Sequence, residues 1–357
     1  MQVDFRELEK KPNMSDIREN PLGRILYDTF ARCTYFSPIL IHNYRARKDK
    51  LLPLYAELNS KRPEKAAATG KKVVFVVTPE TTFNMGLADR LRGITSVYKV
   101  CKELCVPFKL YFKVPNLIDY LEPNQYDWRI DDNGISYDTS EVYPCTLLTF
   151  HANLNDKLQS FAHSKILKYY IRKPYRQIHV HTNMVASENE YGTLFKELFK
   201  PTPLLQEQID QHLPKLGGAS QYFAMVFRFR QLLGDLKEGG EILPKDLREP
   251  YIQRAIKCVE REHEQHPNGT ILVTSDSKTF IQRVSLLPYV YTLPGEVVHM
   301  GVTTDAGKMT YLKSFLDYYM LSYAHTVISV RDKKMYHSGF AYRAAKLNDA
   351  EYKEVWM

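Results

Sequence analysis

The chain has 357 residues, 44% of them hydrophobic and 25% charged, which fits one large domain or two of ordinary size. Its formal net charge of +8 favours phosphates, acidic polymers or an anionic membrane surface as partners. The basic residues are scattered, without an RNP-type aromatic motif or a paired Cys/His zinc module, so we expect no nucleic acid partner.

The five cysteines are an odd number, which is typical of reduced thiols in an intracellular chain. Cys101 and Cys105 lie one helical turn apart, but no further metal ligands accompany them, so we expect no metal site. The start "MQVDFRELEKKP" lacks the apolar segment of a secretory signal, and no apolar run approaches the ~18 residues of a transmembrane helix. These features predict a cytoplasmic protein, and its positive charge leaves peripheral contact with the inner membrane face open.

The first part of the chain, 1–71, is expected to be helical up to about residue 58 and then to form an exposed linker. The β-branched run "VVFVVT" is typical of a buried parallel strand, and a 3.6-residue apolar period from Leu87 to Leu104 predicts a helix. "DDNGIS" predicts a hairpin or a short insertion. Strands of this half are predicted at 73–78, 106–112 and 177–183.

The second half repeats the alternation of strand and helix. Strands are predicted at 221–230, 270–276 and 326–330, and helices at 248–266, 309–324 and 339–347. Such alternation predicts an α/β fold with two Rossmann-like lobes, 72–200 and 201–357, facing a cleft. A ligand is expected in that cleft, at the carboxyl ends of the strands.

Two arginines, Arg228 and Arg230, end the first strand of the second lobe in "VFRFR". Being two residues apart, they are expected on one face of the strand, where they could clamp a diphosphate through paired hydrogen bonds. The alternative is a pair of edge-strand arginines that form surface salt bridges.

Other strand exits carry polar side chains with two interpretations each. In "LVTSDS", Asp276 could accept hydrogen bonds from a base or ribose, or it could cap the following helix, as Ser277 also could. Ser338 and Gly339 fall at the start of the last helix, where free N–H groups and the helix dipole can hold an anion. The alternative there is an ordinary serine cap.

Several common motifs are missing. "GVTTDAGKMT" has the wrong spacing for a P-loop, and no GxGxxG, GxSxG or HExxH sequence occurs. "RIDDN" contains paired aspartates without a D-x-D after a strand. A dinucleotide dehydrogenase, an α/β-hydrolase and a metal-dependent sugar-nucleotide site are therefore not supported.

The order of the motifs carries a resemblance. "MGLADRLRG", "FRFR", "VTSDS", "KSFLDYYMLSYAHTVISV" and "SGFAYRAAK" together resemble the fucosyltransferase-like superfamily of GT-B glycosyltransferases, over roughly residues 72–348. That family has a G-x-G-[ND]-[QR]-L turn, an H-x-R-x-G-D strand, an acidic strand end and a serine-rich helix start. Here Arg228 stands in place of the motif's histidine, Ala88 in place of its second glycine, and "SGF" in place of "SSF".

The resemblance implies a role for each matching residue. Arg230 matches the arginine that binds the β-phosphate of GDP-fucose, Asp276 an aspartate near the guanosine, and Asp317 a structural aspartate. The serine-rich phosphate loop is matched by Ser338, Gly339 and Phe340, and the turn facing the donor by Gly86, Asp89 and Arg90.

The implied activity is inverting, metal-independent transfer of fucose from GDP-fucose to a glycan or lipid-linked oligosaccharide, as in polysaccharide biosynthesis. Arg230 would neutralise the departing diphosphate, and Asp89, followed by Asp235 and Asp305, is the candidate base. Asp89 could equally be a first-turn acid paired with Arg90 or Arg92. The alternatives are a transferase for another nucleotide sugar and a non-catalytic nucleotide- or sugar-binding protein.

Overall fold

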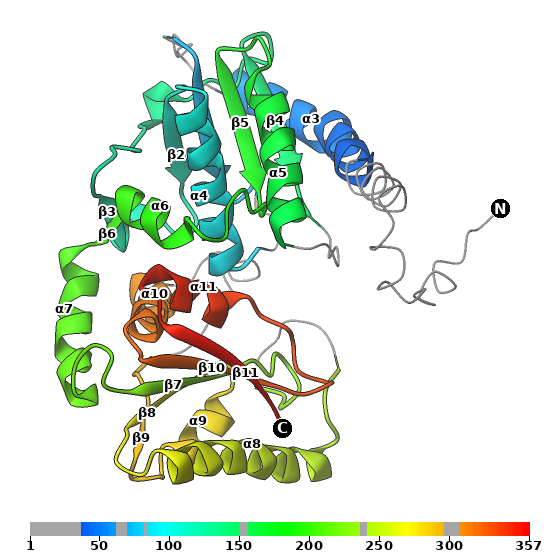
Figure 1. Ribbon diagram of the computed structural model, residues 1–357. Helices are drawn as coiled ribbons and strands as arrows, with labels where there is room; N and C mark the ends of the chain where they lie inside the picture. Colours follow the sequence, from blue (N-terminus) through cyan, green and yellow to red (C-terminus); the bar gives the residue numbers. More distant parts are fainter. Residues whose placement is uncertain (1–36, 62–69, 82–84, 150–155, 236–240, 296–306) are drawn as a thin grey trace, which may run out of the picture.

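The computed structural model describes residues 37–61, 70–81, 85–149, 156–235, 241–295 and 307–357. Within these residues the main strands form two separate parallel sheets, of four and five strands. Figure 1 shows the first sheet with its helices in the upper part of the molecule and the second sheet in the lower part. The α/β class and the alternation of strands with helices are therefore as predicted.

The first sheet has the strand order β2-β1-β5-β4, and all its pairings are parallel. Its strands are β1 (Lys72–Val77), β2 (Phe108–Phe112), β4 (Val142–Leu147) and β5 (Gln177–Thr182). The three strands predicted in this half are confirmed. The edge strand β4 was not predicted, because it contains Pro144, which only an edge strand accommodates readily.

Both faces of the first sheet are covered. Alternate residues of β1 enter different clusters: Val73 and Phe75 join the main core, whereas Val74 packs with Tyr55 on the other face. The helices are a segment at 37–46, the π-helical turn Arg47–Leu51, α3 (Leu52–Ser60), α4 (Leu87–Glu103), α5 (Asp156–Ile171) and α6 (Tyr191–Leu198).

The helical character predicted for the first segment holds for 37–60, and residues 1–36 lie outside the described residues. "DDNG" forms a single 3-10 turn, Asp132–Gly134, and no hairpin. After this short insertion, Ile135 and Tyr137 are buried in the cluster around Tyr55.

The second sheet has the order β11-β10-β7-β8-β9, also with parallel pairings. Its strands are β7 (Phe223–Phe227), β8 (Ile271–Ser275), β9 (Val290–Tyr291), β10 (Thr326–Arg331) and β11 (Glu351–Trp356). Its helices are α8 (Lys245–Gln265), α9 (Lys278–Val284), α10 (Lys308–Ser322) and α11 (Phe340–Leu347). The predicted strands and helices of this half are confirmed, although β7 ends earlier than expected.

The two sheets share one hydrophobic core. The largest cluster joins Phe75 of β1 and Leu91 of α4 to Phe315 of α10 and Ala344 of α11. Tyr120 stacks on Phe315 with the ring centroids 4.5 Å apart. The connecting elements are the 3-10 turns Leu117–Asp119 and Leu213–Leu216, the antiparallel pair β3 (Leu121–Pro123) and β6 (Phe199–Pro201), and α7 (Pro203–His212). This packing holds the carboxyl ends of the two sheets opposite each other.

Candidate functional site between the sheets

A cavity of about 690 Å³ lies between the two sheets. Strand exits of both sheets line it: Thr149 and Asn183 follow β4 and β5, and Arg228 and Asp276 follow β7 and β8. The N-terminal ends of α4 and α11 complete the wall with Gly86, Asp89, Ser338, Gly339 and Phe340. The predicted cleft at the carboxyl ends of the strands therefore exists, and it collects seven of the predicted site residues: Gly86, Asp89, Arg228, Asp276, Ser338, Gly339 and Phe340.

The two arginines that the sequence placed on one strand face lie just beyond the end of β7. The strand ends at Phe227, and Arg230 adopts a left-handed backbone with φ of 55°. Arg228 lines the cavity, whereas the Arg230 guanidinium lies over the ring of Tyr336, 4.9 Å from its centroid. The predicted strand 221–230 is too long, because β7 ends before both arginines, so strand spacing does not fix where their side chains point. Of the two, the cavity-lining arginine is Arg228.

Asp276 organises this turn. Its carboxylate accepts a hydrogen bond from the Arg228 guanidinium and from the backbone N–H groups of Phe229 and Arg230, at 2.8 and 2.7 Å for the two N–H groups. Burial raises the pKa of this carboxyl, and the adjacent Arg228 opposes that shift. Asp276 therefore holds Arg228 in place on the cavity wall, instead of capping the next helix.

The helix cap after β8 belongs to Ser277. Its hydroxyl accepts a hydrogen bond from the N–H of Phe280 at 3.1 Å and donates one to Asp235 at 2.7 Å. Asp235 also accepts from the N–H of Thr279. Neither Ser277 nor Asp235 lines the cavity, so the alternative of an ordinary cap describes Ser277. Asp305, which like Asp235 was a further candidate for the catalytic base, lies outside the described residues.

The start of α11 forms one wall of the cavity. Ser338 accepts a hydrogen bond from the N–H of Phe340 at 3.2 Å, and Gly339 occupies the N-cap position. The following N–H groups of the first turn point toward the helix N-terminus, as in any α-helix. This end of the helix therefore offers a hydroxyl, backbone donors and a positive dipole end to an anion in the cavity.

The start of α4 forms the facing wall. Gly86 is its N-cap, and the carboxylate of Asp89 lies 2.9 Å from the guanidinium of Arg92, which also lines the cavity. Arg90 is fully buried and lies outside the cavity lining, since its guanidinium donates to the carbonyls of Met85 and Val114. The expected donor contact of Arg90 is thus replaced by a structural role. Its burial lowers its pKa to about 10.

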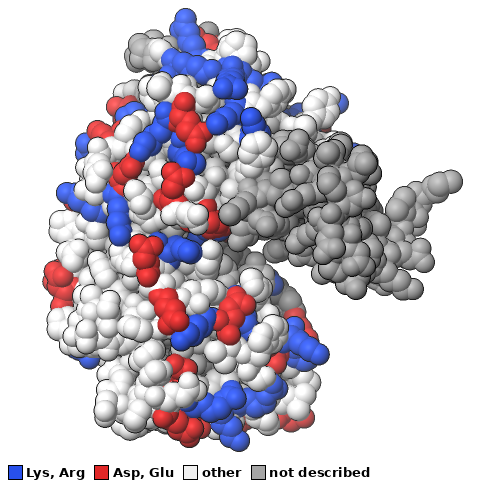
Figure 2. Space-filling model, viewed as in Figure 1, with Lys and Arg blue, Asp and Glu red and all other residues white. Residues whose placement is uncertain are grey.

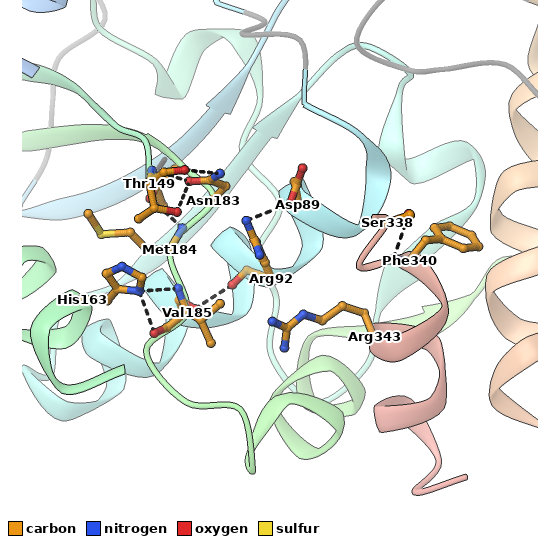
Figure 3. Close-up of polar contacts among 12 residues, drawn as sticks. Asp89, Arg92, Thr149, His163, Asn183, Met184, Val185, Ser338, Phe340 and Arg343 are labelled. Atoms are coloured by element: carbon orange, nitrogen blue, oxygen red, sulfur yellow. Dashed lines mark hydrogen bonds and ion pairs between the residues drawn. The ribbon is translucent and has the colours of Figure 1, made fainter. Parts of the chain in front are cut away.

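Arg343 and its partner Glu188 are cavity residues that the sequence motifs did not identify. Arg343 of α11 binds Glu188 with both terminal nitrogens, and the pair joins α11 to the loop before α6. Figure 3 shows Arg343 and Arg92 on facing sides of the space that also holds Asp89 and Ser338. Arg343 lies one turn after Phe340 in "SGFAYRAAK", so helical spacing from the serine loop is the signal that could have found it.

Two further ion pairs complete the lining. Arg331, the last residue of β10, lies 2.6 Å from Glu354 of β11. Like Arg228, it lies at the carboxyl end of a strand, so its position in the sequence could have identified it as a cavity residue. In α10, the ammonium of Lys313 donates to Asp317, and burial raises the pKa of that carboxyl. Asp317, expected to be structural, lines the cavity as well as pairing with Lys313.

The first-sheet wall carries neutral hydrogen-bonding groups. Asn183 accepts from the backbone N–H and the hydroxyl of Thr149, at 2.8 and 3.1 Å, and Gln159 lies on the same wall. Behind it, the ring of His163 accepts from the N–H of Val185 at 3.0 Å (Figure 3). Such neutral donors and acceptors suit a polar, uncharged molecule such as a sugar.

The part of the chain that the structure describes lacks two features. This part of the chain holds no group of three or more His, Cys, Asp or Glu residues placed to hold a metal ion. Its helices include none that is long and apolar enough to cross a membrane.

Comparisons with known proteins concern the fold. No protein-family model matches the sequence, and no curated protein sequence matches it significantly. Among solved structures, an arginine-to-lysine mutant of Arabidopsis thaliana FUT1 in complex with GDP is 12% identical, with a TM-score of 0.50 over 85% of this chain and 73% of that one.

Two other fucosyltransferase structures are similar. NodZ α-1,6-fucosyltransferase soaked with GDP-fucose is 13% identical, with a TM-score of 0.48 over 78% of this chain and 93% of that one. POFUT1 in complex with GDP is 12% identical, with a TM-score of 0.46 over 82% of this chain and 99% of that one. The likeness to the plant enzyme shows that the chain shares its fold, as the motif order predicted.

Proposed function

We propose that this protein is an inverting, metal-independent glycosyltransferase that moves fucose from GDP-fucose to a hydroxyl group of a glycan or lipid-linked oligosaccharide. The observation that carries the proposal is that Arg228 and the N-terminus of α11 line the same cavity. These two features supply the charge and the backbone donors that a nucleoside diphosphate requires. The shared fold with a GDP-bound fucosyltransferase supports GDP as the nucleotide. A cytoplasmic location and the absence of a cofactor are parts of the same proposal.

In the proposed reaction, the acceptor oxygen forms a bond to the anomeric carbon while the bond from that carbon to the β-phosphate oxygen breaks. The sugar develops oxocarbenium character, and negative charge accumulates on the departing GDP. Arg228, held by Asp276, and the N–H groups of α11 would stabilise this charge. Preorganised donors of this kind are typically worth on the order of 10²–10³ in rate.

The acceptor proton needs a base on the opposite side of the donor sugar. Asp89 fits this role, because it lines the cavity from the α4 wall, opposite Ser338 and Gly339 of the α11 wall. Arg92 would orient the Asp89 carboxylate through their contact at 2.9 Å. The neutral wall formed by Thr149 and Asn183 would hold the acceptor sugar.

Arg230 has an indirect role in this proposal, through Asp276 and Tyr336. Its backbone N–H helps to fix Asp276, and its guanidinium covers the ring of Tyr336, which lines the cavity. The role that the resemblance gave to Arg230 stays a prediction. We infer that Arg228, which lines the cavity directly, takes the larger share of diphosphate binding.

Nucleotide binding tests the proposal most directly. Thermal unfolding should be measured with GDP, UDP, CMP and ADP on the wild-type protein and on Arg228→Lys, which keeps a positive charge beside Asp276. We expect selective stabilisation by GDP, about 2.7 kcal/mol at a ligand concentration of ~100 times its dissociation constant. In Arg228→Lys, the loss of charge-assisted hydrogen bonds should weaken GDP binding by about tenfold.

The matched control is Arg254→Lys, because Arg254 pairs with Asp332 on the surface and does not line the cavity. Its affinity for GDP should equal that of the wild type. Stabilisation by UDP in place of GDP would refute the fucose donor, and no stabilisation by any of the four nucleotides would refute a nucleotide-sugar site. GDP release from GDP-fucose, with and without added glycans, then tests turnover.

A further inference from the structure

Exposed apolar side chains gather on two helices beside the first sheet. The described residues include twelve large hydrophobic side chains that are exposed, and five of them lie in the 37–46 helix and α5. Their exposed fractions range from 38 to 67%. These five are Leu40, Ile41, Tyr44, Phe161 and Tyr169. Single exposed apolar residues need no explanation, but a concentration on neighbouring helices marks an interaction surface.

The two helices lie side by side. The Asn43 amide donates to the Tyr170 hydroxyl at 2.9 Å and so joins the first helix to α5. Between them, the ring of Tyr143 is covered by Arg47, at 4.3 Å from its centroid, and by Lys173, at 5.1 Å. The five exposed apolar residues therefore lie on neighbouring helices, and we call their exposed surface the α5 face.

Basic residues alternate with the aromatic ones along α5. Phe161, Lys165 and Tyr169 follow one another at intervals of four, so they lie on neighbouring turns of α5, and Lys173 follows just after its end. Lys165 lies 5.3 Å from the Phe161 ring centroid, and Lys173 lies 4.6 Å from that of Tyr169. Arg172 is exposed next to them. Figure 2 shows Lys and Arg side chains predominating at the end of the first-sheet part farthest from the second sheet.

We propose that the α5 face binds the surface of an anionic lipid bilayer. Apolar and aromatic side chains enter the boundary between headgroups and acyl chains, while lysine and arginine remain at the lipid phosphates. Nucleic acids and acidic polysaccharides would also attract the basic residues. Leu40 and Ile41, however, have neither hydrogen-bonding groups nor a ring to stack on them, so the mixed composition favours lipid.

The position of the face links docking to the cavity. Gln159, which lines the cavity, precedes Phe161 by two residues on α5. A bilayer bound to the α5 face would therefore lie beside the first-sheet wall of the cavity, where a lipid-linked acceptor could enter. This link rests on the proposed function, whereas membrane binding itself does not, because none of the α5-face residues named above lines the cavity.

Vesicle co-sedimentation tests the proposal. The full chain should bind vesicles that contain about a third phosphatidylserine in phosphatidylcholine, and should not bind phosphatidylcholine alone. Raising the salt concentration should weaken the binding, because screening reduces attraction between surface charges. Equal binding to both vesicle types, or binding to neither, would overturn the proposal.

Charge-reversal variants locate the surface. Lys165→Glu with Arg172→Glu should lower the partition coefficient onto anionic vesicles by at least about tenfold. The matched control, Lys215→Glu with Lys257→Glu, changes the net charge equally at exposed positions of the other part of the molecule. It should bind nearly as the wild type does. An equal loss in both pairs would show attraction by net charge alone and would refute a defined face.

A second pair separates lipid from other polyanions. Phe161→Ser with Tyr169→Ser keeps every charge, so it should weaken vesicle binding severalfold while binding to heparin stays unchanged. Equal loss of vesicle and heparin binding, or retention of both, would contradict insertion into lipid. Unchanged thermal unfolding temperatures and unchanged GDP binding would establish that the variants are folded, independently of the outcome on vesicles.

Discussion

Each arginine that lines the cavity within the described residues lies against a carboxylate. The four pairs join Arg92 to Asp89, Arg228 to Asp276, Arg331 to Glu354 and Arg343 to Glu188. The positive charge of the cavity is therefore compensated before any ligand binds. An entering diphosphate gains hydrogen bonds from the arginines in competition with these carboxylates, and the carboxylates reduce the repulsion among the guanidinium groups.

The role of Asp89 can be tested by its amide variant. Asp89→Asn keeps the shape of the side chain but removes the basic oxygen, so kcat should fall by about 10²–10⁴ while GDP affinity stays within about twofold. Steady-state transfer kinetics and nucleotide titration measure the two effects. The control is Asp119→Asn, whose carboxylate pairs with Lys308 outside the cavity lining. Retention of wild-type kcat in Asp89→Asn would exclude Asp89 as the base.

Buried histidines give stability a defined pH dependence. Burial lowers the pKa of both His163 and His181 to about 4, from the ordinary value of 6.5. As the pH falls, the unfolded chain binds these protons first. The contribution of these two histidines to the free energy of unfolding is therefore fully present above pH 6.5. It is lost as the pH falls from 6.5 to 4, by about 1.4 kcal/mol per pH unit for each histidine.

Urea unfolding of the wild type and of His163→Asn, measured across this pH range, tests that dependence. The asparagine oxygen can still accept from the Val185 N–H, and the variant should lose one histidine's share of the slope. Equal slopes for the wild type and His163→Asn would show that His163 does not titrate in this way.

At the scale of elements, one glycine sets how closely α4 approaches β5. A Cβ atom added to Gly93 would lie 1.9 Å from the carbonyl oxygen of Thr182, at the end of β5. This contact is with backbone, so it cannot be relieved by a rotamer change. The second glycine of "GLADRLRG" therefore allows the start of α4, with Gly86 and Asp89, to reach the cavity.

Gly93→Ala should consequently lower the free energy of unfolding by at least about 3 kcal/mol, or prevent folding. The comparison is Gly307→Ala, where an added Cβ would meet no atom within 4 Å and where the backbone is extended. That change should cost less than about 1 kcal/mol, the usual effect of alanine at a helix N-cap. Chemical denaturation of both variants measures the difference, and similar costs would refute the steric argument.

At the scale of the whole molecule, the two sheets are joined by a buried, largely apolar interface. The Tyr191 and Tyr318 hydroxyls meet at 2.5 Å, and Arg343 of α11 binds Glu188 of the first-sheet part. Because the largest core cluster includes residues of both sheets, unfolding of either sheet would expose part of the other's core. A large apolar interface of this kind opposes independent domain motion.

The chain should therefore unfold in one cooperative transition. In Trp356→Phe, the remaining Trp128 is buried in the first-sheet part, where its indole donates to the Leu198 carbonyl at 2.7 Å. Its fluorescence should change at the same denaturant concentration as far-UV circular dichroism, which reports helices of both parts. Separate midpoints for the two signals would show that the sheets unfold independently.

The sequence alone determined the alternation of strands and helices, because β-branched runs and 3.6-residue periods depend only on the order of residue types. It also determined which segments meet the cleft, since the carboxyl ends of parallel strands share one edge of their sheet. On that basis it identified Asp89, Arg228 and Ser338 as cavity residues.

Only the tertiary structure decided what each of these side chains does. The turn after β7 places Arg228, and not Arg230, in the cavity lining, and Asp276 holds that turn through hydrogen bonds across 46 to 48 residues of chain. The close approach of α4 to β5 buries Arg90, and the shared core brings Arg343 to Glu188. Residue spacing could not predict these contacts, because they depend on distances between segments far apart in the chain.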